Sequence, residues 1–345
     1  MRDGTSRYAV RRLALLLPQL LAVSAVTFIL IRQLPGDPAR AILGPHATAA
    51  SIETLHRTMG LDRPILTQYW LYLGRVVHGD LGYSWFTSQP VLTDLGRRAP
   101  ATLELITLSM VVAVTVGLAI GLVSAAKRNR GAVVRGVGVY TRLAGAFPDF
   151  WIGLLAVYIF FYRLRIAPAP LGRLSFTVSP PRGITGFYSI DSLVTGNLIA
   201  FRDAMAHLAL PVLVLGLILA PMVARVTNVS MSESLRSDYV RYARAAGLSR
   251  WMVYRYALRN ALPQIMTIGG VLFVYLLGGA VLIEKVFSWG GVGQYAVQAV
   301  GNSDFAAIQG FVLLAATFTV LVYLVVDLVH KAIDPRVGDL ETRER

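Results

Sequence analysis

The chain of 345 residues contains no cysteine, which excludes disulfide bonds, thiolate metal sites and a cysteine nucleophile. Charge is also scarce, since Asp, Glu, Lys and Arg make up 15% of the residues, whereas a soluble domain carries about 25%. Hydrophobic residues account for 55%, and several apolar runs reach the roughly 20 residues that a helix needs to cross a bilayer. The composition therefore predicts an all-α membrane protein.

Lysine is rare, and the chain lacks the motifs of the commonest catalytic sites. None of the three lysines, Lys127, Lys285 and Lys331, follows a glycine, so the chain holds no P-loop for ATP. It has no H-E-x-x-H and no G-x-S-x-G motif. The five histidines are scattered without the spacing of metal ligands. We therefore expect no catalytic residues, no metal site and no cofactor bound by this chain.

What the chain has in place of these motifs is a series of long apolar runs. Six of them are predicted to span the membrane: 13–31, 101–126, 143–162, 204–224, 263–283 and 307–329. The first run is too long for a secretory signal, lacks an A-x-A site and is followed by five more spans. The sequence therefore predicts six transmembrane helices.

The formal net charge of +14 is a sign of nucleic-acid binding in some proteins, but here the arginines are spread between the spans. With the N-terminus inside, the inner segments 1–12, 127–142, 225–262 and 330–345 hold 20 Arg and Lys in 82 residues. The outer segments hold 13 in 133 residues. By the positive-inside rule both termini are predicted to be cytoplasmic, and no nucleic-acid partner is expected.

Two outer segments are long enough to carry structure of their own. Segment 32–100 contains helix-like stretches, ATAASIETLHRTMG and ILTQYWLYLGRVVHG, separated by turn signals, and it is too long for a plain connection. We expect it to form a small extracytoplasmic cap. Segment 163–203 is rich in Gly, Pro and Ser and is expected to be a looser loop.

These segments give a predicted division of the chain. An N-terminal tail and first span cover 1–31, the extracytoplasmic segment covers 32–100, and a five-span core covers 101–336. Within the core lies a cytoplasmic loop at 232–263, and a cytoplasmic tail follows at 337–345.

Three acidic residues fall inside predicted spans, where an ionisable group is a functional candidate. Glu104 and Asp327 lie close to span ends, from which their carboxylates are expected to reach the interface. Asp149 is deeper, next to Pro148. Two interpretations of Asp149 stay open: a structural position near an interface or a loosened backbone turn, and a place on a substrate path. Asp149 and Glu284 are the candidate path residues.

The cytoplasmic stretch RYARAAGLSRWMVYRYALRNALP at 241–263 contains five arginines beside small residues. Ser237 or Asp238 is suited to cap a short helix that runs to Ala246. Gly247 suits the position after that helix, where positive φ costs glycine little. Ser249 is suited to cap a second helix, and Pro263 is expected to open the fifth span.

The alanines of this stretch indicate a role beyond membrane orientation. Ala243, Ala245 and Ala246 give the first helix a surface of small side chains, which another molecule can approach closely. An ordinary positive-inside loop, the alternative interpretation, would need only scattered cations. We favour a docking element for a cytoplasmic protein.

Several motifs in order resemble one known family, the permease subunits of bacterial ABC importers (binding-protein-dependent transport system inner membrane components). Its dipeptide/oligopeptide/nickel branch carries a coupling loop that reads D-Y-x-R-x-A-R-A-x-G-L, and this chain has DYVRYARAAGL at 238–248. The resemblance extends over nearly the whole chain, through RRLALLLPQLLAVSAVTFILIRQLPGDPA, MGLDRPILTQYWLYL, HGDLGYS, RRAPATLEL, HLALPVLVLGLILA, YLLGGAVLIEKVFSWGGVG and VDLVHKAIDPR. The sequence departs from the branch at Gly290, where Pro is more usual and a looser outer turn is expected, and at Asp149.

The resemblance implies a type I ABC importer permease fold and a set of partners. These are a second homologous permease, two cytoplasmic ATPase subunits that bind ATP and Mg, and an extracytoplasmic binding protein. It also implies that the loop couples the permease to the ATPases, through Asp238, Arg241, Tyr242, Ala243, Arg244, Ala245, Ala246, Gly247, Leu248 and Pro263. Di- and oligopeptides are the leading substrates. Nickel or another small solute remains an alternative, as does an ion-driven secondary transporter with Asp149 as its coupling acid.

Overall fold

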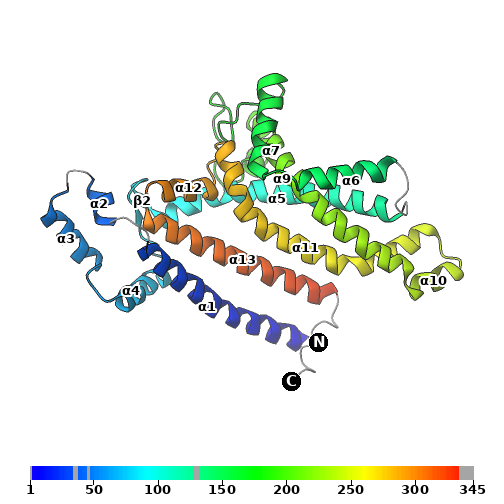
Figure 1. Ribbon diagram of the computed structural model, residues 1–345, viewed down its shortest axis with the longest axis horizontal. Coiled ribbons are helices and arrows are strands. Elements are labelled where there is room, and N and C mark those ends of the chain that lie inside the picture. Colours follow the sequence, from blue (N-terminus) through cyan, green and yellow to red (C-terminus); the bar gives the residue numbers. More distant parts are fainter. Residues whose placement is uncertain (1, 34–37, 45–46, 127–131, 334–345) are drawn as a thin grey trace. The chain divides into compact units, whose positions relative to one another are not determined.

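The computed structural model describes residues 2–33, 38–44, 47–126 and 132–333, and most of them are helical (Figure 1). The prediction of an all-α membrane protein is confirmed. Parts of three predicted features lie outside the described residues: the LPGDP motif at 34–38, the basic run at 127–130 and the tail at 337–345.

The elements are α1 (Arg2–Gln33), α2 (Pro38–Leu43), α3 (Ala49–Met59), α4 (Ile65–Val77), β1 (Tyr83–Ser84), β2 (Gln89–Pro90), α5 (Val91–Ala126), α6 (Ala132–Ala144), α7 (Asp149–Ala156), the π-helix η1 (Val157–Arg163), α8 (Tyr188–Val194), α9 (Leu198–Arg236), α10 (Asp238–Ala245), α11 (Arg250–Val286), α12 (Val292–Gly301) and α13 (Phe305–Ile333).

The predicted spans correspond to helices of different kinds. Among the described residues, α5, α9, α11 and α13 are long and apolar enough to cross a membrane, and α1 contains the shorter apolar stretch 17–33. The third predicted span, 143–162, is not one straight helix. It contains the end of α6 and the helix formed by α7 and η1, which meet at an angle of 106°. Pro148 stands at the break as the N-cap of α7, a position that its missing N–H and fixed φ suit.

Two other helices run further than the sequence indicated, and both contain prolines. The fourth span was expected to stop at 224, but α9 continues to Arg236 with Pro211 and Pro221 inside it. The second helix of the cytoplasmic loop and the fifth span were expected to meet at Pro263, yet α11 runs unbroken through this residue. A proline in a helix interior costs about 3 kcal/mol, an amount that the packing of α11 along α9 can offset.

The chain forms two compact units, and the domain division predicted from the sequence remains a prediction. One unit comprises residues 1–102 and 290–320. Its core joins the start of α5 to α12 and α13 through Leu95, Tyr295 and Ala307. The expected helical stretches of the outer segment are present as α3 and α4. The small hairpin β1–β2 was not expected, and Ser84 fixes it by donating a 2.5 Å hydrogen bond to Asp304.

The second unit comprises residues 103–289 and 321–345, and the long helices α9 and α11 run along each other in it, with α10 between their ends (Figure 1). Glycines let α5 approach α9 closely. A Cβ atom at Gly117 would lie 2.5 Å from Val223, and one at Gly121 would lie 2.5 Å from Thr227. This small-xxx-small spacing is typical of packed membrane helices.

Segment 163–203 is not the loose loop that its Gly and Pro content indicated. Buried Asp191 accepts hydrogen bonds from the backbone N–H groups of Ile184, Thr185 and Gly186 and from the Thr185 hydroxyl. Asp203 likewise accepts from the N–H and hydroxyl of Ser175 at 2.6 and 2.7 Å. Short side-chain bonds of this kind fix turns that hydrophobic packing alone leaves undefined.

The hydrogen bonds of Asp191 predict how this segment responds to acid. Burial acts to raise the pKa of Asp191, but its bonds to Thr185, Ile184 and Gly186 outweigh burial and lower the pKa below the ordinary value. The resulting stabilisation is present above the unfolded-state pKa of about 3.9 and is lost as pH falls through the lower folded-state pKa. We expect Asp191→Asn to reduce stability at neutral pH by roughly 2 kcal/mol. As the pH is lowered into the acidic range, the melting temperature of this variant should fall less steeply than that of the unmodified protein. An equally steep fall would contradict this.

Candidate functional site

The predicted helix, glycine turn and second helix are present on the cytoplasmic loop. α10 ends at Ala245, one residue before the predicted end, and Gly247 follows with φ +74°. The Gly247 N–H donates to the Arg244 carbonyl at 3.1 Å, and the Leu248 N–H donates to the Ala243 carbonyl at 3.1 Å. This pair of bonds is a Schellman motif, which satisfies the last carbonyls of a helix.

The caps on either side of α10 differ from each other. Ser249 accepts a 3.4 Å hydrogen bond from the Met252 N–H and caps α11, as predicted. Ser237 does not cap α10, because its hydroxyl donates to the Ser234 carbonyl at the end of α9. Asp238 pairs with Arg241 at 3.2 Å, but both side chains are exposed and such a pair contributes little.

One face of α10 is built into the protein. Val240 and Ala243 are buried against a cluster formed by Met231 of α9 and by Val253 and Ala257 of α11. Ala243 is only 7% exposed, which corrects its expected place on the approachable surface. The alanine is needed here because a larger side chain would push α10 away from the two long helices.

The opposite face of α10 is open. Its exposed residues are Tyr239, Arg241, Tyr242, Arg244, Ala245 and Ala246. Among the described residues the one acid within ion-pair distance of its arginines is exposed Asp238. The result is a cationic and aromatic surface that two long helices hold in place. Such a surface suits an acidic groove on another protein.

Substitution of Ala243 tests this packing. We expect Ala243→Glu to detach α10 from α9 and α11, because burying an unpaired carboxylate costs several kcal/mol. The protein should still insert and be purified with its long helices intact. Limited proteolysis should show faster cleavage around 238–248. Ala245→Glu, at an exposed position of the same helix, should leave that cleavage rate unchanged.

The two candidate path residues have different environments. Asp149 lies half-buried in the first turn of α7, and the Tyr275 hydroxyl of α11 donates to its carboxylate at 3.4 Å. Gly153 allows α7 to pack closely on Ile283 of α11. Glu284 is 0% exposed and lies within α11. Both residues stay candidates for the path, Asp149 at a half-buried position and Glu284 at a fully buried one.

Glu104 does not reach toward an interface as expected. It is 2% exposed and forms a 2.6 Å ion pair with Arg173 from segment 163–203. It also accepts hydrogen bonds from the Ser189 N–H and hydroxyl and from the Tyr188 N–H. The Arg173 guanidinium lies 3.6 Å from the centre of the Tyr188 ring. The one signal for this site in the sequence is an acid inside a span, which needs a partner.

The described residues contain no group of three or more His, Asp or Glu side chains that would hold a metal ion. The carboxylates of Asp191, Asp203 and Glu104 instead accept hydrogen bonds from the segment 175–189. What the arrangement provides is an exposed cationic and aromatic face on α10, long helices that carry it, and the Asp149 carboxylate between α7 and α11.

Comparisons with known proteins find two family models that together match most of the chain. The model of the family described as "Binding-protein-dependent transport system inner membrane component" matches residues 117–339. The model of its N-terminal part matches residues 5–106.

Curated relatives are similar over almost their whole length. The probable D,D-dipeptide transport system permease protein DdpB of Escherichia coli is 41% identical over 322 residues, which cover 92% of this chain and 93% of that protein. The dipeptide transport system permease protein DppB of Alkalihalophilus pseudofirmus is 39% identical, with coverage of 96% and 98%. The glutathione transport system permease protein GsiC of Escherichia coli is 36% identical, also with coverage of 96% and 98%.

Proposed function

Because this chain belongs to the family of binding-protein-dependent transport system inner membrane components, we propose that it is the permease of an ABC importer that carries di- or oligopeptides. It is a multi-pass inner membrane transport permease. The peptide substrate is supported by relatives named for D,D-dipeptide, dipeptide and di/tripeptide transport at 37–41% identity. The arginine distribution supports cytoplasmic N- and C-termini.

The observation that carries the proposed mechanism is the open face of α10 on a rigid support. We assign this face, with Gly247 and Leu248 behind it, to a groove on a cytoplasmic ATPase subunit. The full importer then contains a second homologous permease, two ATPase subunits that hold ATP and Mg, and an extracytoplasmic binding protein. Tyr242, which is 77% exposed, is the side chain best placed to enter the groove.

The unbroken helices explain how movement is passed on. α9 extends from the membrane region to Arg236 next to α10, and α11 runs from Arg250 through Pro263 into the membrane region. A pull on α10 therefore acts on both helices, because Val240 and Ala243 pack it against Met231 of α9 and Val253 of α11. When the ATPases close, both helices move with α10 as a rigid body and switch the path between inward-open and outward-open states.

The decisive experiment is uptake by the reconstituted complex. With intact ATPases and the binding protein, we expect ATP-dependent accumulation of labelled dipeptides in liposomes. An ATPase subunit that binds but does not hydrolyse ATP should stop it. Persistent uptake in that complex, driven by an ion gradient, would favour the secondary-transporter alternative. Uptake of nickel without uptake of peptides would agree with the ABC mechanism. It would show, however, that the substrate is nickel and not a peptide.

Asp149 is proposed to contact positively charged groups of the passing peptide, because its carboxylate lies half-exposed between α7 and α11. We expect Asp149→Asn to lower the uptake of lysine-containing dipeptides about tenfold more than that of neutral ones, since a hydrogen bond to a charged group contributes about 1.5–3 kcal/mol. Tyr275→Phe removes the neighbouring hydroxyl and keeps the carboxylate, so it should show no such selectivity. An equal loss for both peptide classes would assign Asp149 to structure alone.

A further inference from the structure

A proline inside α9 leaves one carbonyl of that helix without its usual donor. In an α-helix the N–H of each residue donates to the carbonyl four positions before it, and proline has no N–H. Because Pro221 stands inside α9, the Leu217 carbonyl lacks the N–H that would normally bond to it. Both residues belong to the predicted fourth span, where water is not at hand to replace a missing donor, so the carbonyl needs one from a neighbouring helix.

The missing donor comes from α6. The Tyr140 hydroxyl donates to the Leu217 carbonyl, across 77 positions of the sequence. Tyr140 is partly buried, and α6 contacts α9 within the same compact unit. This hydrogen bond therefore does two things: it completes the bonding of α9 at its proline, and it fastens α6 to α9.

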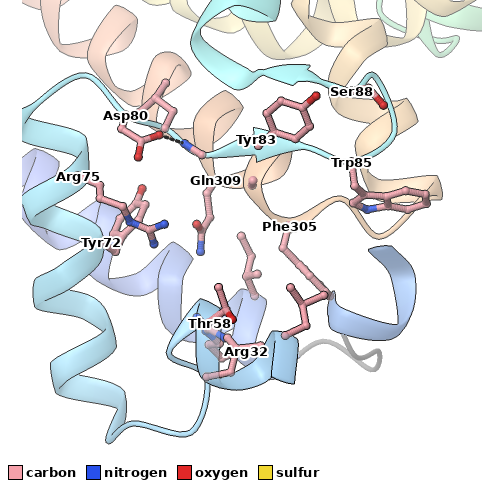
Figure 2. Close-up of a pocket in the computed structure, with 16 residues that line it drawn as sticks. Arg32, Thr58, Tyr72, Arg75, Asp80, Tyr83, Trp85, Ser88, Phe305 and Gln309 are labelled. Atoms are coloured by element: carbon pink, nitrogen blue, oxygen red, sulfur yellow. Dashed lines mark hydrogen bonds between the residues drawn. The ribbon is translucent and has the colours of Figure 1, made fainter. Parts of the chain in front are cut away.

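Apolar packing beside this hydrogen bond is incomplete. A cavity of about 750 Å³ lies between α9 and the bent pair that α6 forms with α7 and η1, and Tyr140 and Leu217 are both in its wall. The cavity of about 660 Å³ in the other unit has a charged wall, in which Figure 2 shows Arg32, Arg75 and Asp80. By contrast, none of the described residues that line the cavity beside α9 is charged. The hydrogen bond of Tyr140 is thus a directional tie across a space that apolar packing leaves open.

The bent pair carries Asp149, one of the candidate path residues. Between α6 and α7 the chain turns at Pro148, the N-cap of α7. The Phe147 and Trp151 rings stack across this turn with their centroids 4.8 Å apart. Asp149 lies in the first turn of α7, directly after this packed turn. Whatever holds α6 in place therefore also positions the start of α7 and its carboxylate.

The other half of the bent pair is packed on α11. A Cβ atom at Gly153 of α7 would lie 2.9 Å from the Ile283 side chain of α11, so the two helices are in close contact. The bent pair consequently bridges the two long helices. Its α7 part is held on α11 by close packing, and its α6 part is tied to α9 by Tyr140.

We propose that Tyr140 is a positioning residue that makes the bent pair move with α9 when α10 is displaced. This inference rests on the proposed function, in which a cytoplasmic ATPase pulls on α10. α9 carries the movement from its end at Arg236 past Leu217, and the Tyr140 hydroxyl transfers it to α6 and so to Asp149. Without this bond α9 moves while α6 lags behind, and ATP is hydrolysed with less transport.

The test measures dipeptide uptake and ATP hydrolysis together in the reconstituted complex. Tyr140→Phe removes the hydroxyl and keeps the ring. It should lower the number of dipeptides accumulated per ATP about fivefold, the effect expected for one lost hydrogen bond, and leave pull-down of the ATPase subunits unchanged. It should also lower the melting temperature, because Leu217 loses its donor. The same number of dipeptides per ATP as in the unmodified complex would overturn the proposal.

Pro221→Ala separates positioning from the mere completion of α9. It gives Leu217 a donor within the helix, and Tyr140 can still bond because a carbonyl oxygen has two lone pairs. When Tyr140→Phe is combined with Pro221→Ala, the melting temperature should return to that of Pro221→Ala alone. The number of dipeptides per ATP should stay low, because α6 is still not tied to α9. If both quantities recover together, Tyr140 serves only the stability of α9, and the proposal fails.

Tyr69 provides a matched control in the other unit. Its hydroxyl also donates to a helix carbonyl, that of Leu21 in α1, at 3.1 Å. The residue four positions after Leu21 is Ala25, which has an N–H of its own to donate. Tyr69→Phe should therefore leave the number of dipeptides per ATP unchanged. A loss as large as that of Tyr140→Phe would show that removing any such hydroxyl impairs transport, and it would contradict a special role for Tyr140.

The tie between α6 and α9 can also be measured without transport. The chain has no cysteine, so Val139→Cys on α6 and Val229→Cys on α9, which are 48% and 50% exposed, accept spin labels at defined positions. In the full complex with cysteine-free partners, the distribution of distances between the labels should be broader in Tyr140→Phe than with Tyr140 present. An equally narrow distribution would overturn the proposal. A complex that shows the broadening but takes up no dipeptides would instead refute the proposed function and leave the tie in place.

Discussion

Gly247→Asp is expected to leave the permease inserted and assembled with the proposed second permease but to reduce ATP-dependent peptide uptake by more than tenfold. Gly247 adopts φ +74°, which costs about 1 kcal/mol or more for a residue with a side chain. The new carboxylate would also add negative charge at the C-terminal end of α10, where the helix dipole disfavours it. On a surface proposed to meet acidic groups, like charges cost several kcal/mol. The measurements are uptake in proteoliposomes and pull-down of the ATPase subunits.

A second glycine provides a control with the same backbone strain. Gly196 follows α8, in the segment predicted to lie on the other side of the membrane, with φ +69° and, like Gly247, would place a Cβ atom in open space. Its N–H donates to the Leu193 carbonyl, and the Asn197 N–H donates to the Ser192 carbonyl. Gly196→Asp should therefore lower the melting temperature by a similar amount and retain binding of the ATPases. If both variants lose ATPase binding equally, backbone strain explains the effect and the docking assignment of α10 fails.

Features that depend on neighbouring residues were predictable from the sequence. The Gly247 turn, the Ser249 cap and the helices α3 and α4 follow from capping and periodicity, which act within a few residues. The proline positions show where this reasoning ends. Pro148 stands at a helix break, whereas α11 continues through Pro263. A proline weakens a helix locally, and the packing of the whole helix decides whether it breaks.

Contacts between distant segments could not be predicted in the same way. Ala243 looked like part of an open small-residue face, but the faces of an eight-residue helix are assigned by what packs on it, here α9 and α11. A looser turn was expected at Gly290. Instead, the Gly290 N–H donates to the Gln294 side chain at 2.7 Å, a hydrogen bond that proline could not donate. In each case the missing information is the position of a partner elsewhere in the chain.

The ion pair Glu104–Arg173 joins residues that are 69 positions apart in the sequence. Removing one of its charges is the second change that we expect to have a large effect. We expect Glu104→Gln to destabilise the permease by about 3–5 kcal/mol, the usual cost of removing one partner from a buried ion pair. Arg173 would remain 11% exposed with its charge uncompensated, and its Nε already has no hydrogen-bond partner among the described residues. Segment 163–203 would then lose its contact with α5. The melting temperature in detergent and the rate of proteolysis within 163–190 measure these changes.

A double variant distinguishes the lost charge balance from lost shape. Arg173→Met removes the orphaned cation, so Glu104→Gln combined with Arg173→Met should be more stable than Glu104→Gln alone, because buried ion pairs can be replaced by neutral side chains of similar volume at little cost. Exposed Arg57 and Glu53, which pair at 2.5 Å on α3, serve as the matched surface pair, and Glu53→Gln should change stability by less than about 1 kcal/mol. A double variant no more stable than the single one would show that the hydrogen bonds of Glu104 to Tyr188 and Ser189, rather than its pairing with Arg173, hold the segment on α5.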